Sequence, residues 1–240
     1  MDGMTMFHHE WRVNMSTPIH ILEPKGKNRH ETVVIFHGWG SSIENYRQFA
    51  NELCELGYEV MLPELLYHDS RGQLENMYAT ETIQRHFWEV IFHTLEEAKH
   101  ILSAASNPIE NTKVLGVSLG GFIASGILAQ NPEIAGLVNI NGSGAFEMSE
   151  TIFRKESGRE EMTMEERAVL RKVDPIHHPI RNKQILCVHG DADTVVSMEG
   201  QKEFVRSFEQ SNELTFRVYP EVNHTITDEM SADVMAWLKK

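Results

Sequence analysis

The hydrophobic positions of the chain form two kinds of pattern that alternate along it: short continuous runs typical of buried strands, and residues at helical spacing. Residues 33–36 form a wholly apolar, β-branched run, which is typical of a strand that is buried on both faces. Apolar residues then recur at helical spacing over 43–56 and again over 80–104. Further strands are predicted at 58–62, 113–117, 135–140, 184–188 and 214–219, and further helices at 119–130, 197–209 and 225–238. This alternation predicts an α/β fold with a mostly parallel central sheet and helices on both faces.

The amino-terminal residues show a different pattern. Residues 4–13 and 17–23 alternate in polarity, and Asn14-Met15-Ser16 lies between them. We interpret these two stretches as an antiparallel hairpin at one edge of the sheet, which brings the expected total to about eight strands.

The segment 143–183 interrupts the alternation. It spans 41 residues without a clear strand, contains eight acidic and eight basic residues, and is helical in pattern from 149 to 172. We predict a cap or lid inserted over one end of the sheet, because long insertions in compact domains are often functional. A longer helical crossover is the alternative.

Composition narrows the class of protein. Hydrophobic residues make up 41% of the 240 residues, and the formal net charge is −13. That charge repels polyanions, so nucleic acids are not expected as partners. No apolar run approaches the length of a membrane span, and the first 13 residues lack the apolar core of a signal peptide. The two cysteines form no disulfide framework. We expect a cytoplasmic protein.

The strongest local motif is Gly116-Val117-Ser118-Leu119-Gly120, which fits G-x-S-x-G. It lies where a predicted strand ends and an apolar helix begins, and this strand-to-helix turn is the context that a nucleophile elbow requires. Such a turn projects the serine hydroxyl outward, and a Cβ at the flanking glycines would collide with neighbouring backbone. The alternative is a serine in a glycine-rich turn that has no chemical role.

A serine nucleophile needs a general base, and four of the thirteen histidines follow Ser118. His177 and His178 lie in the insert, and His189 ends a strand. His224 lies between the last strand and the last helix, at the carboxyl edge of the sheet, where open α/β sheets hold their active sites. We therefore predict His224 as the base. A loop histidine that caps the last helix is the alternative.

The acid that orients the base should follow the preceding strand. Asp191 and Asp193 both occupy that loop, and alternation does not separate them. Either one could instead be a turn or cap aspartate. Glu147, after the strand before, is a more remote candidate.

The remaining requirement is an oxyanion hole of two backbone N–H groups. Leu119 follows the nucleophile and supplies the first group. The loop Phe36-His37-Gly38-Trp39-Gly40 follows the first central strand, and the N–H of Trp39 is the expected second donor. The Trp39 side chain would then be free to form a wall of the acyl pocket. A plain turn without this role is the alternative.

Other chemistry is not expected. The chain has no G-x-G-x-x-G motif and no P-loop, so no cofactor is predicted. The adjacent pairs His8-His9 and His177-His178 cannot share one face of an element, so no metal site is predicted either. Arg71 is interpreted as the brace of a loop rather than as a substrate contact.

This constellation resembles the α/β-hydrolase family. The order of His37-Gly38-Trp39-Gly40, the elbow at Ser118, His189-Gly190-x-x-Asp193-x-Val195 and Asn223-His224 is that of the family. The branch is similar to the small bacterial esterases near dienelactone hydrolase and the prolyl-oligopeptidase catalytic domain. That resemblance implies Asp193 as the acid, and it supports His224, Trp39 and Leu119. Dienelactone hydrolase itself has a cysteine nucleophile where this chain has Ser118.

The expected function is hydrolysis of carboxylic esters of small or medium acyl chain through an acyl-enzyme. A thioesterase or an acyl-aminoacyl peptidase would use the same residues, and a binding module on this fold is a further alternative. The expected partner is a small-molecule ester, with the protein a monomer or homodimer. Because the candidate residues extend from 37 to 224 and must meet at one edge, residues 1–240 are predicted to form a single domain.

Overall fold

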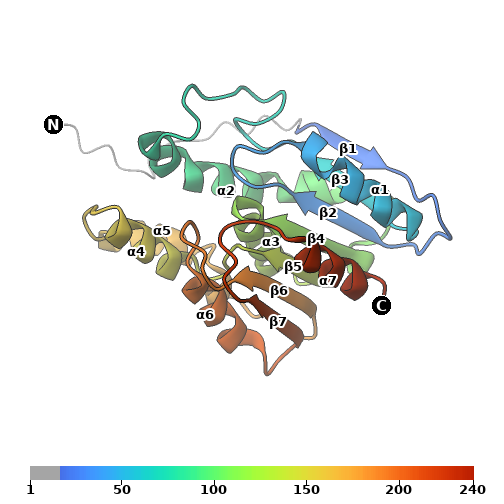
Figure 1. Ribbon diagram of the computed structural model, residues 1–240. Helices are drawn as coiled ribbons and strands as arrows, with labels where there is room; N and C mark the ends of the chain where they lie inside the picture. Colours follow the sequence, from blue (N-terminus) through green and yellow to red (C-terminus); the bar gives the residue numbers. More distant parts are fainter. Residues whose placement is uncertain (1–16) are drawn as a thin grey trace.

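The computed structural model describes residues 17–240, which are built around a seven-stranded sheet (Figure 1). The strands lie in the order β1-β3-β2-β4-β5-β6-β7. Their bounds are Ile19–Leu22 (β1), Thr32–Phe36 (β2), Glu59–Pro63 (β3), Thr112–Val117 (β4), Gly136–Ile140 (β5), Gln184–Gly190 (β6) and Glu213–Tyr219 (β7). Every neighbouring pair is parallel except β1 and β3. The prediction of a mostly parallel sheet is therefore confirmed.

The edge strand β1 is the described part of the predicted hairpin. It pairs antiparallel with β3, and Ile19 lies opposite Pro63. The other predicted arm, 4–13, lies outside the described residues. The predicted strand at 17–23 is thus present, with β3 as its partner.

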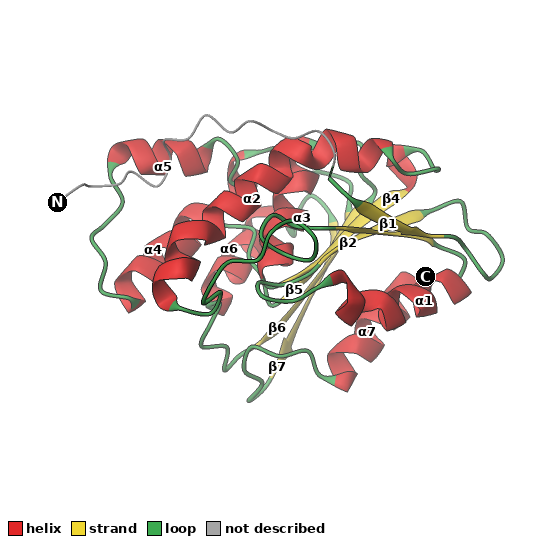
Figure 2. Cartoon of the chain, turned by 90° about the horizontal axis from the view of Figure 1, so that it is seen from above, coloured by secondary structure: helices red, strands yellow, loops and turns green. Residues whose placement is uncertain are grey.

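Helices cover both faces of the sheet (Figure 2). Their bounds are Arg47–Glu55 (α1), Thr80–Ser103 (α2), Leu119–Gln130 (α3), Phe146–Glu156 (α4), Met164–Arg171 (α5), Met198–Phe208 (α6) and Asp228–Leu238 (α7). Short 3-10 helices lie at Ile43–Tyr46, Ile109–Asn111 and Pro175–His177. Side chains alternate along β2, so Val34 and Phe36 pack with α2, α3 and α6, whereas Val33 and Ile35 pack with α1 and α7.

Helix α3 lies in the middle of the molecule, between the sheet and α2. Its residues from Leu119 to Ala129 are all buried, which explains why its sequence is apolar on every side. At Gly126 an added Cβ would lie 2.8 Å from a methyl carbon of Leu95 on α2, so this glycine permits the close approach of the two helices.

Two helix predictions need correction. The helical pattern over 149–172 forms two helices, α4 and α5, because Gly158 adopts a φ of +65° and Thr163 starts α5 with a capping box. The last helix begins at Asp228, and its cap is Thr227, whose hydroxyl accepts the N–H of Met230. The predicted start of this helix at 225 is therefore three residues too early.

Candidate active site

The turn at Ser118 connects β4 to α3 and has a strained backbone. Ser118 adopts a φ of +55° and a ψ of −118°, which is unusual for a residue with a side chain. An added Cβ at Gly116 would lie 1.8 Å from the carbonyl oxygen of Gly120, and one at Gly120 would lie 2.0 Å from that of Phe36. Both positions therefore require glycine, as the motif predicts.

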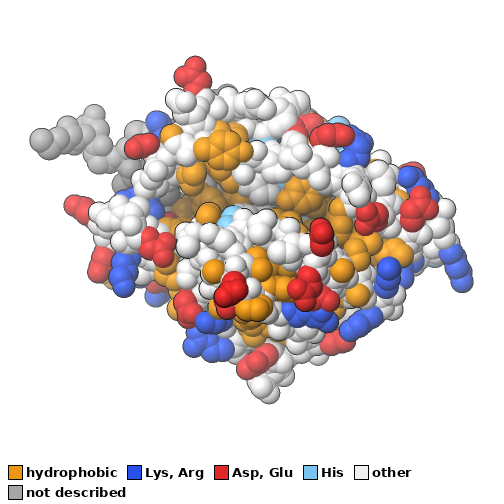
Figure 3. Space-filling view, viewed as in Figure 1, with side chains coloured by type: hydrophobic (Ala, Val, Ile, Leu, Met, Phe, Trp, Pro, Cys, Tyr) orange, Lys and Arg blue, Asp and Glu red, His pale blue; other side chains and the backbone are white. Residues whose placement is uncertain are grey.

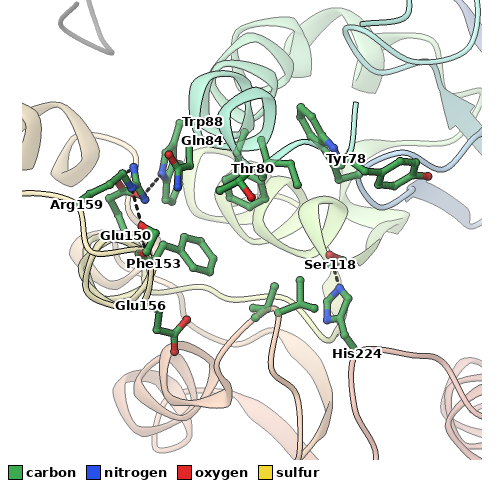
Figure 4. A pocket seen from close by; sticks show the side chains of 16 residues that line it. Tyr78, Thr80, Gln84, Trp88, Ser118, Glu150, Phe153, Glu156, Arg159 and His224 are labelled. Carbon is green, nitrogen blue, oxygen red and sulfur yellow. Dashed lines mark hydrogen bonds and ion pairs between the residues drawn. The ribbon is translucent and has the colours of Figure 1, made fainter. Parts of the chain in front are cut away.

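A chain of hydrogen bonds joins Ser118 to two residues from distant loops. The Ser118 hydroxyl lies 2.8 Å from Nε2 of His224, which follows β7 (Figure 4). On the other side of the ring, Nδ1 lies 2.7 Å from Oδ2 of Asp193, which follows β6. Because a carboxylate only accepts, Nδ1 carries the hydrogen and Nε2 can accept the serine proton. The structure thus brings together three residues that lie far apart in the sequence.

The side chain of Asp193 is fully buried. The backbone N–H groups of Val195 and Val196 donate to its Oδ1 at 2.8 and 2.9 Å. Burial alone would raise the pKa of Asp193, but contacts with His189, His224 and the Val196 N–H outweigh it and hold the pKa well below its usual range. Asp193 is therefore ionised and can stabilise a protonated His224.

The contact from His189 was not predicted. Its Nε2 lies 3.3 Å from Oδ2 of Asp193 and 3.0 Å from the carbonyl oxygen of Val196, so it touches both ends of the acid turn. The sequence placed His189 at a strand end four residues before Asp193, and that spacing is the only signal that could have indicated the contact.

The other two candidate acids lie elsewhere. Asp191 accepts the N–H of Glu221 at 2.7 Å and so stabilises a neighbouring turn. Glu147 forms ion pairs with Arg167 and Arg171 between α4 and α5. Of the three carboxylates, the structure places Asp193 on His224.

One predicted oxyanion residue follows the serine in the chain, and the other belongs to a loop that packs against the serine. Leu119 is the first residue of α3, and an added Cβ at Gly38 would lie 3.4 Å from the Cβ of Ser118. The Trp39 side chain lines the same pocket as Ser118, and its indole N–H donates to the carbonyl oxygen of Met77 at 2.8 Å. The role of the two backbone N–H groups stays a prediction.

A pocket of about 580 Å³ opens from Ser118. Apolar side chains gather around the hollow on this face of the molecule (Figure 3). The lining comes from α2, α4, the loops beside them and the loops that follow β2, β4, β6 and β7: Trp39, Tyr78, Thr80, Ile83, Gln84, Phe87, Trp88, Ser118, Glu150, Phe153, Glu156, Ser157, Arg159, Val195, Val196 and His224. The large share contributed by α2 was not predicted from the sequence.

The end of the pocket farthest from Ser118 carries a buried carboxylate, Glu150 on α4 (Figure 4). It is 1% exposed. The indole N–H of Trp88 donates to Oε2 at 2.8 Å. Oε1 accepts from Arg154 at 2.6 Å and from Arg159 at 3.1 Å. Both oxygens therefore have partners within the protein.

Comparison with known proteins decides the family. The sequence model of the dienelactone hydrolase family matches residues 19–236. The chain belongs to the dienelactone hydrolase family. The resemblance to this branch is thereby confirmed, although the elbow carries serine.

Two relatives of the chain are named as esterases. The chain is 24% identical over 213 residues to "Esterase YjfP" of Escherichia coli (strain K12), covering 82% of this chain and 83% of the relative. It is 31% identical over 134 residues to "Putative esterase YitV" of Bacillus subtilis (strain 168), and this match spans 52% of the chain and half the length of that relative. Family and relatives together indicate an enzyme that hydrolyses esters.

Solved structures show the same fold. TT1662 from Thermus thermophilus matches with a TM-score of 0.71 at 18% identity, over 94% of this chain and 93% of the other. Acetyl xylan esterase 1 from Thermoanaerobacterium sp. JW/SL YS485 matches with a TM-score of 0.69 at 16% identity, over 92% of this chain and 78% of the other. These likenesses support the α/β-hydrolase fold. In the described part of the chain, no helix has the length and hydropathy that crossing a membrane requires.

Proposed function

We propose that this protein is a serine esterase that cleaves carboxylic esters of small or medium acyl chain. The observation that carries the proposal is the hydrogen-bond chain from Ser118 through His224 to Asp193. The serine end of this chain lines a mostly apolar pocket. A serine, a histidine and a buried ionised aspartate in this order are the groups that acyl transfer requires.

The proposed reaction has two halves. Ser118 Oγ attacks the ester carbonyl while Nε2 of His224 takes the hydroxyl proton, and the ionised Asp193 stabilises the resulting imidazolium. The tetrahedral intermediate collapses, and the alcohol leaves with the proton from His224. Water then gives a proton to His224 and attacks the acyl-enzyme, and His224 returns that proton to Ser118 Oγ as the acid is released.

The negative oxygen of each intermediate needs hydrogen-bond donors. We assign this role to the backbone N–H groups of Trp39 and Leu119, each of which contributes about 3 kcal/mol to the transition state. The strained φ of Ser118 supports the assignment, because the turn exposes the hydroxyl at the start of α3.

The substrate's acyl chain is assigned to the apolar part of the pocket. Ile83, Phe87 and Phe153 line it between the serine and the Glu150 end. The insert that contributes Phe153 would therefore act as a cap over the acyl group, whereas the alcohol would leave toward solvent.

The test uses Ser118→Ala with p-nitrophenyl acetate. The variant should fold like the wild type by circular dichroism and lose at least about 10⁴-fold in kcat, because the nucleophile is gone. A folded variant that retains the wild-type rate would contradict the proposal.

A further inference from the structure

The loop between β3 and α2 supports the predicted oxyanion loop on both sides of Trp39, directly through His68 and indirectly through His37. On one side, the carbonyl oxygen of Gly38 accepts a hydrogen bond from Nδ1 of His37 at 2.8 Å. On the other, the N–H of Gly40 donates to Nε2 of His68 at 2.9 Å. The backbone atoms that flank Trp39 are therefore both held by imidazole rings.

The geometry of the peptide bond turns these contacts into a constraint on Trp39. The carbonyl of Gly38 and the N–H of Trp39 belong to one planar, trans peptide and point in opposite directions. A ring that fixes the Gly38 oxygen therefore also fixes the direction of the Trp39 N–H. A bond to the carbonyl also polarises the peptide, which strengthens that N–H as a donor.

The contacts of His68 fix the tautomer in which Nε2 can accept a hydrogen bond from the Gly40 N–H. Its Nδ1 lies 2.8 Å from the carbonyl oxygen of Leu66, so Nδ1 carries the hydrogen and Nε2 keeps its lone pair for Gly40. Burial lowers the pKa of His68 to about 4, so the ring is neutral near pH 7. The contact with Gly40 is thus present under ordinary assay conditions.

Asp69 holds the imidazole ring of His37. Its Oδ2 lies 3.3 Å from Nε2 of His37, an ion pair that forms when both ring nitrogens of His37 carry a hydrogen, and its Oδ1 accepts the N–H of Ile43 at 3.1 Å. The side chains of His37 and Asp69 are 2% and 10% exposed, so water competes little for this contact. Burial alone would raise the pKa of Asp69, but the contacts with His37 and Ile43 lower it, which keeps the carboxylate charged.

The backbone of this loop is strained at two residues next to His68. Tyr67 and Asp69 both adopt positive φ values, +65° and +50°, on either side of His68. Arg71 holds the loop from its far end, with two bonds to Glu97 at 2.9 and 2.7 Å and one to the carbonyl oxygen of Glu64. Arg71 is thus a brace, as its sequence context suggested.

We propose that His68, and Asp69 acting through His37, are positioning residues of the oxyanion hole: they hold the backbone on both sides of Trp39 so that its N–H points at the reacting oxygen. The proposal rests on the esterase function proposed above and extends it to residues that do not touch the substrate.

The test compares His68→Leu, which removes the acceptor, with His68→Gln, whose amide oxygen can accept the Gly40 N–H. His68→Leu should lower kcat for p-nitrophenyl acetate at least about tenfold, because a misdirected oxyanion donor loses much of its effect. KM should stay within about twofold, and His68→Gln should recover most of kcat. Asp69→Asn should also lower kcat. Asparagine tolerates the positive φ at this position, so the loss would not come from backbone strain.

A second readout separates positioning from general loss of structure. A short alkyl trifluoromethyl ketone forms an oxyanion with the serine, so its inhibition constant should rise by the factor by which kcat falls. The control is Tyr58→Phe, which removes a buried hydrogen bond to the carbonyl oxygen of Leu238, far from the pocket. It should lower the melting temperature and leave kcat and the inhibition constant unchanged.

Two results would count against the proposal in different ways. If folded His68→Leu and Asp69→Asn keep the wild-type kcat and ketone affinity, the positioning role is wrong and the esterase function stands. If the wild type itself hydrolyses no ester and binds no ketone, the esterase function is wrong, and the positioning role is overturned with it.

Discussion

A buried carboxylate supports each end of the pocket, Glu150 in its wall and Asp193 behind His224, and the two carboxylates have different partners. Asp193, behind the serine, shares one oxygen with His224, a ring that can gain and lose a proton. Glu150, at the far end, is bound by the permanent cations Arg154 and Arg159. The same chemical group therefore supports the proposed proton transfer at one end, whereas at the other end its partners are structural.

The difference also appears in the backbone around each end. Ser118 has a positive φ, and the side chain of Asn141 joins the ends of the two loops that carry Asp193 and His224: it accepts the N–H of Gly190 at 3.2 Å and donates to the carbonyl oxygen of Thr225 at 2.7 Å. Glu150 lies within the regular helix α4. The catalytic end thus uses irregular backbone to aim reactive atoms, whereas the other end uses a helix to fix a wall.

The largest effect is expected at the catalytic carboxylate. Asp193→Asn should lower kcat for p-nitrophenyl acetate about 10⁴-fold, because the amide no longer stabilises a protonated His224 and favours the wrong tautomer. Asp191→Asn is the matched control, and its kcat should change less than about threefold. Steady-state kinetics check both, and a larger loss in Asp191→Asn would reassign the acid.

Glu150→Gln should act on stability instead. Removing the charge weakens the buried contacts of Arg154 and Arg159, although Arg154 keeps Glu166 as a carboxylate partner, so the free energy of unfolding should fall by about 2 kcal/mol. The kcat for p-nitrophenyl acetate should stay within about threefold, because this end does not touch the small acyl group. Urea denaturation and steady-state kinetics measure the two quantities.

The control for that variant is Glu147→Gln in the same helix. Glu147 also pairs with two arginines, but Arg171 is 58% exposed, so solvent screens the interaction. Its unfolding free energy should change by less than about 1 kcal/mol. Equal effects in the two variants would show that burial does not distinguish the two carboxylates.

The apolar stretch between the ends should control acyl length. Phe153→Ala removes a ring that packs edge-on against Phe87 at a centroid distance of 5.6 Å. The ratio of kcat/KM for p-nitrophenyl hexanoate over acetate should fall about tenfold, since a longer chain loses more apolar contact. Phe49→Ala, on the opposite face of the sheet, should leave the ratio unchanged, and a fall there would remove the assignment of the acyl site.

The smallest effect concerns pH. The pKa of Asp193 is lower in the folded chain than its unfolded value of about 3.9, so the carboxylate stabilises the fold above that pH and loses this contribution as pH falls through the folded pKa. The difference in unfolding free energy between wild type and Asp193→Asn should therefore shrink below about pH 4. A difference that stays constant down to about pH 2 would contradict an ionised Asp193.

Much of the site could be predicted because its signals are local. The serine turn requires two glycines, and both are part of the G-x-S-x-G motif. The order of the strands places His224 at the same edge of the sheet as Ser118. The choice between Asp191 and Asp193 came from family resemblance, since both lie in one loop. The structure separates them by the direction of each turn: Asp191 faces Glu221 and Asp193 faces His224.

The parts that escaped prediction depend on contacts between distant segments. Trp88 and Glu150 are 62 residues apart, and nothing in either sequence context indicates that they meet. The contact of His68 with Gly40 spans 28 residues in the same way. By contrast, the break between α4 and α5 was readable, because Thr163 and Glu166 have the spacing of a capping box.

The central claim is that Ser118 is a nucleophile activated through His224 by Asp193. The most direct measurement is the rate of labelling by a fluorophosphonate probe, with the modified residue located by peptide mass spectrometry. The wild type and Glu150→Gln should be labelled at similar rates on Ser118, and Asp193→Asn at least about 10³-fold more slowly. A folded wild type that stays unlabelled at neutral pH, or a label on another residue, would contradict the claim.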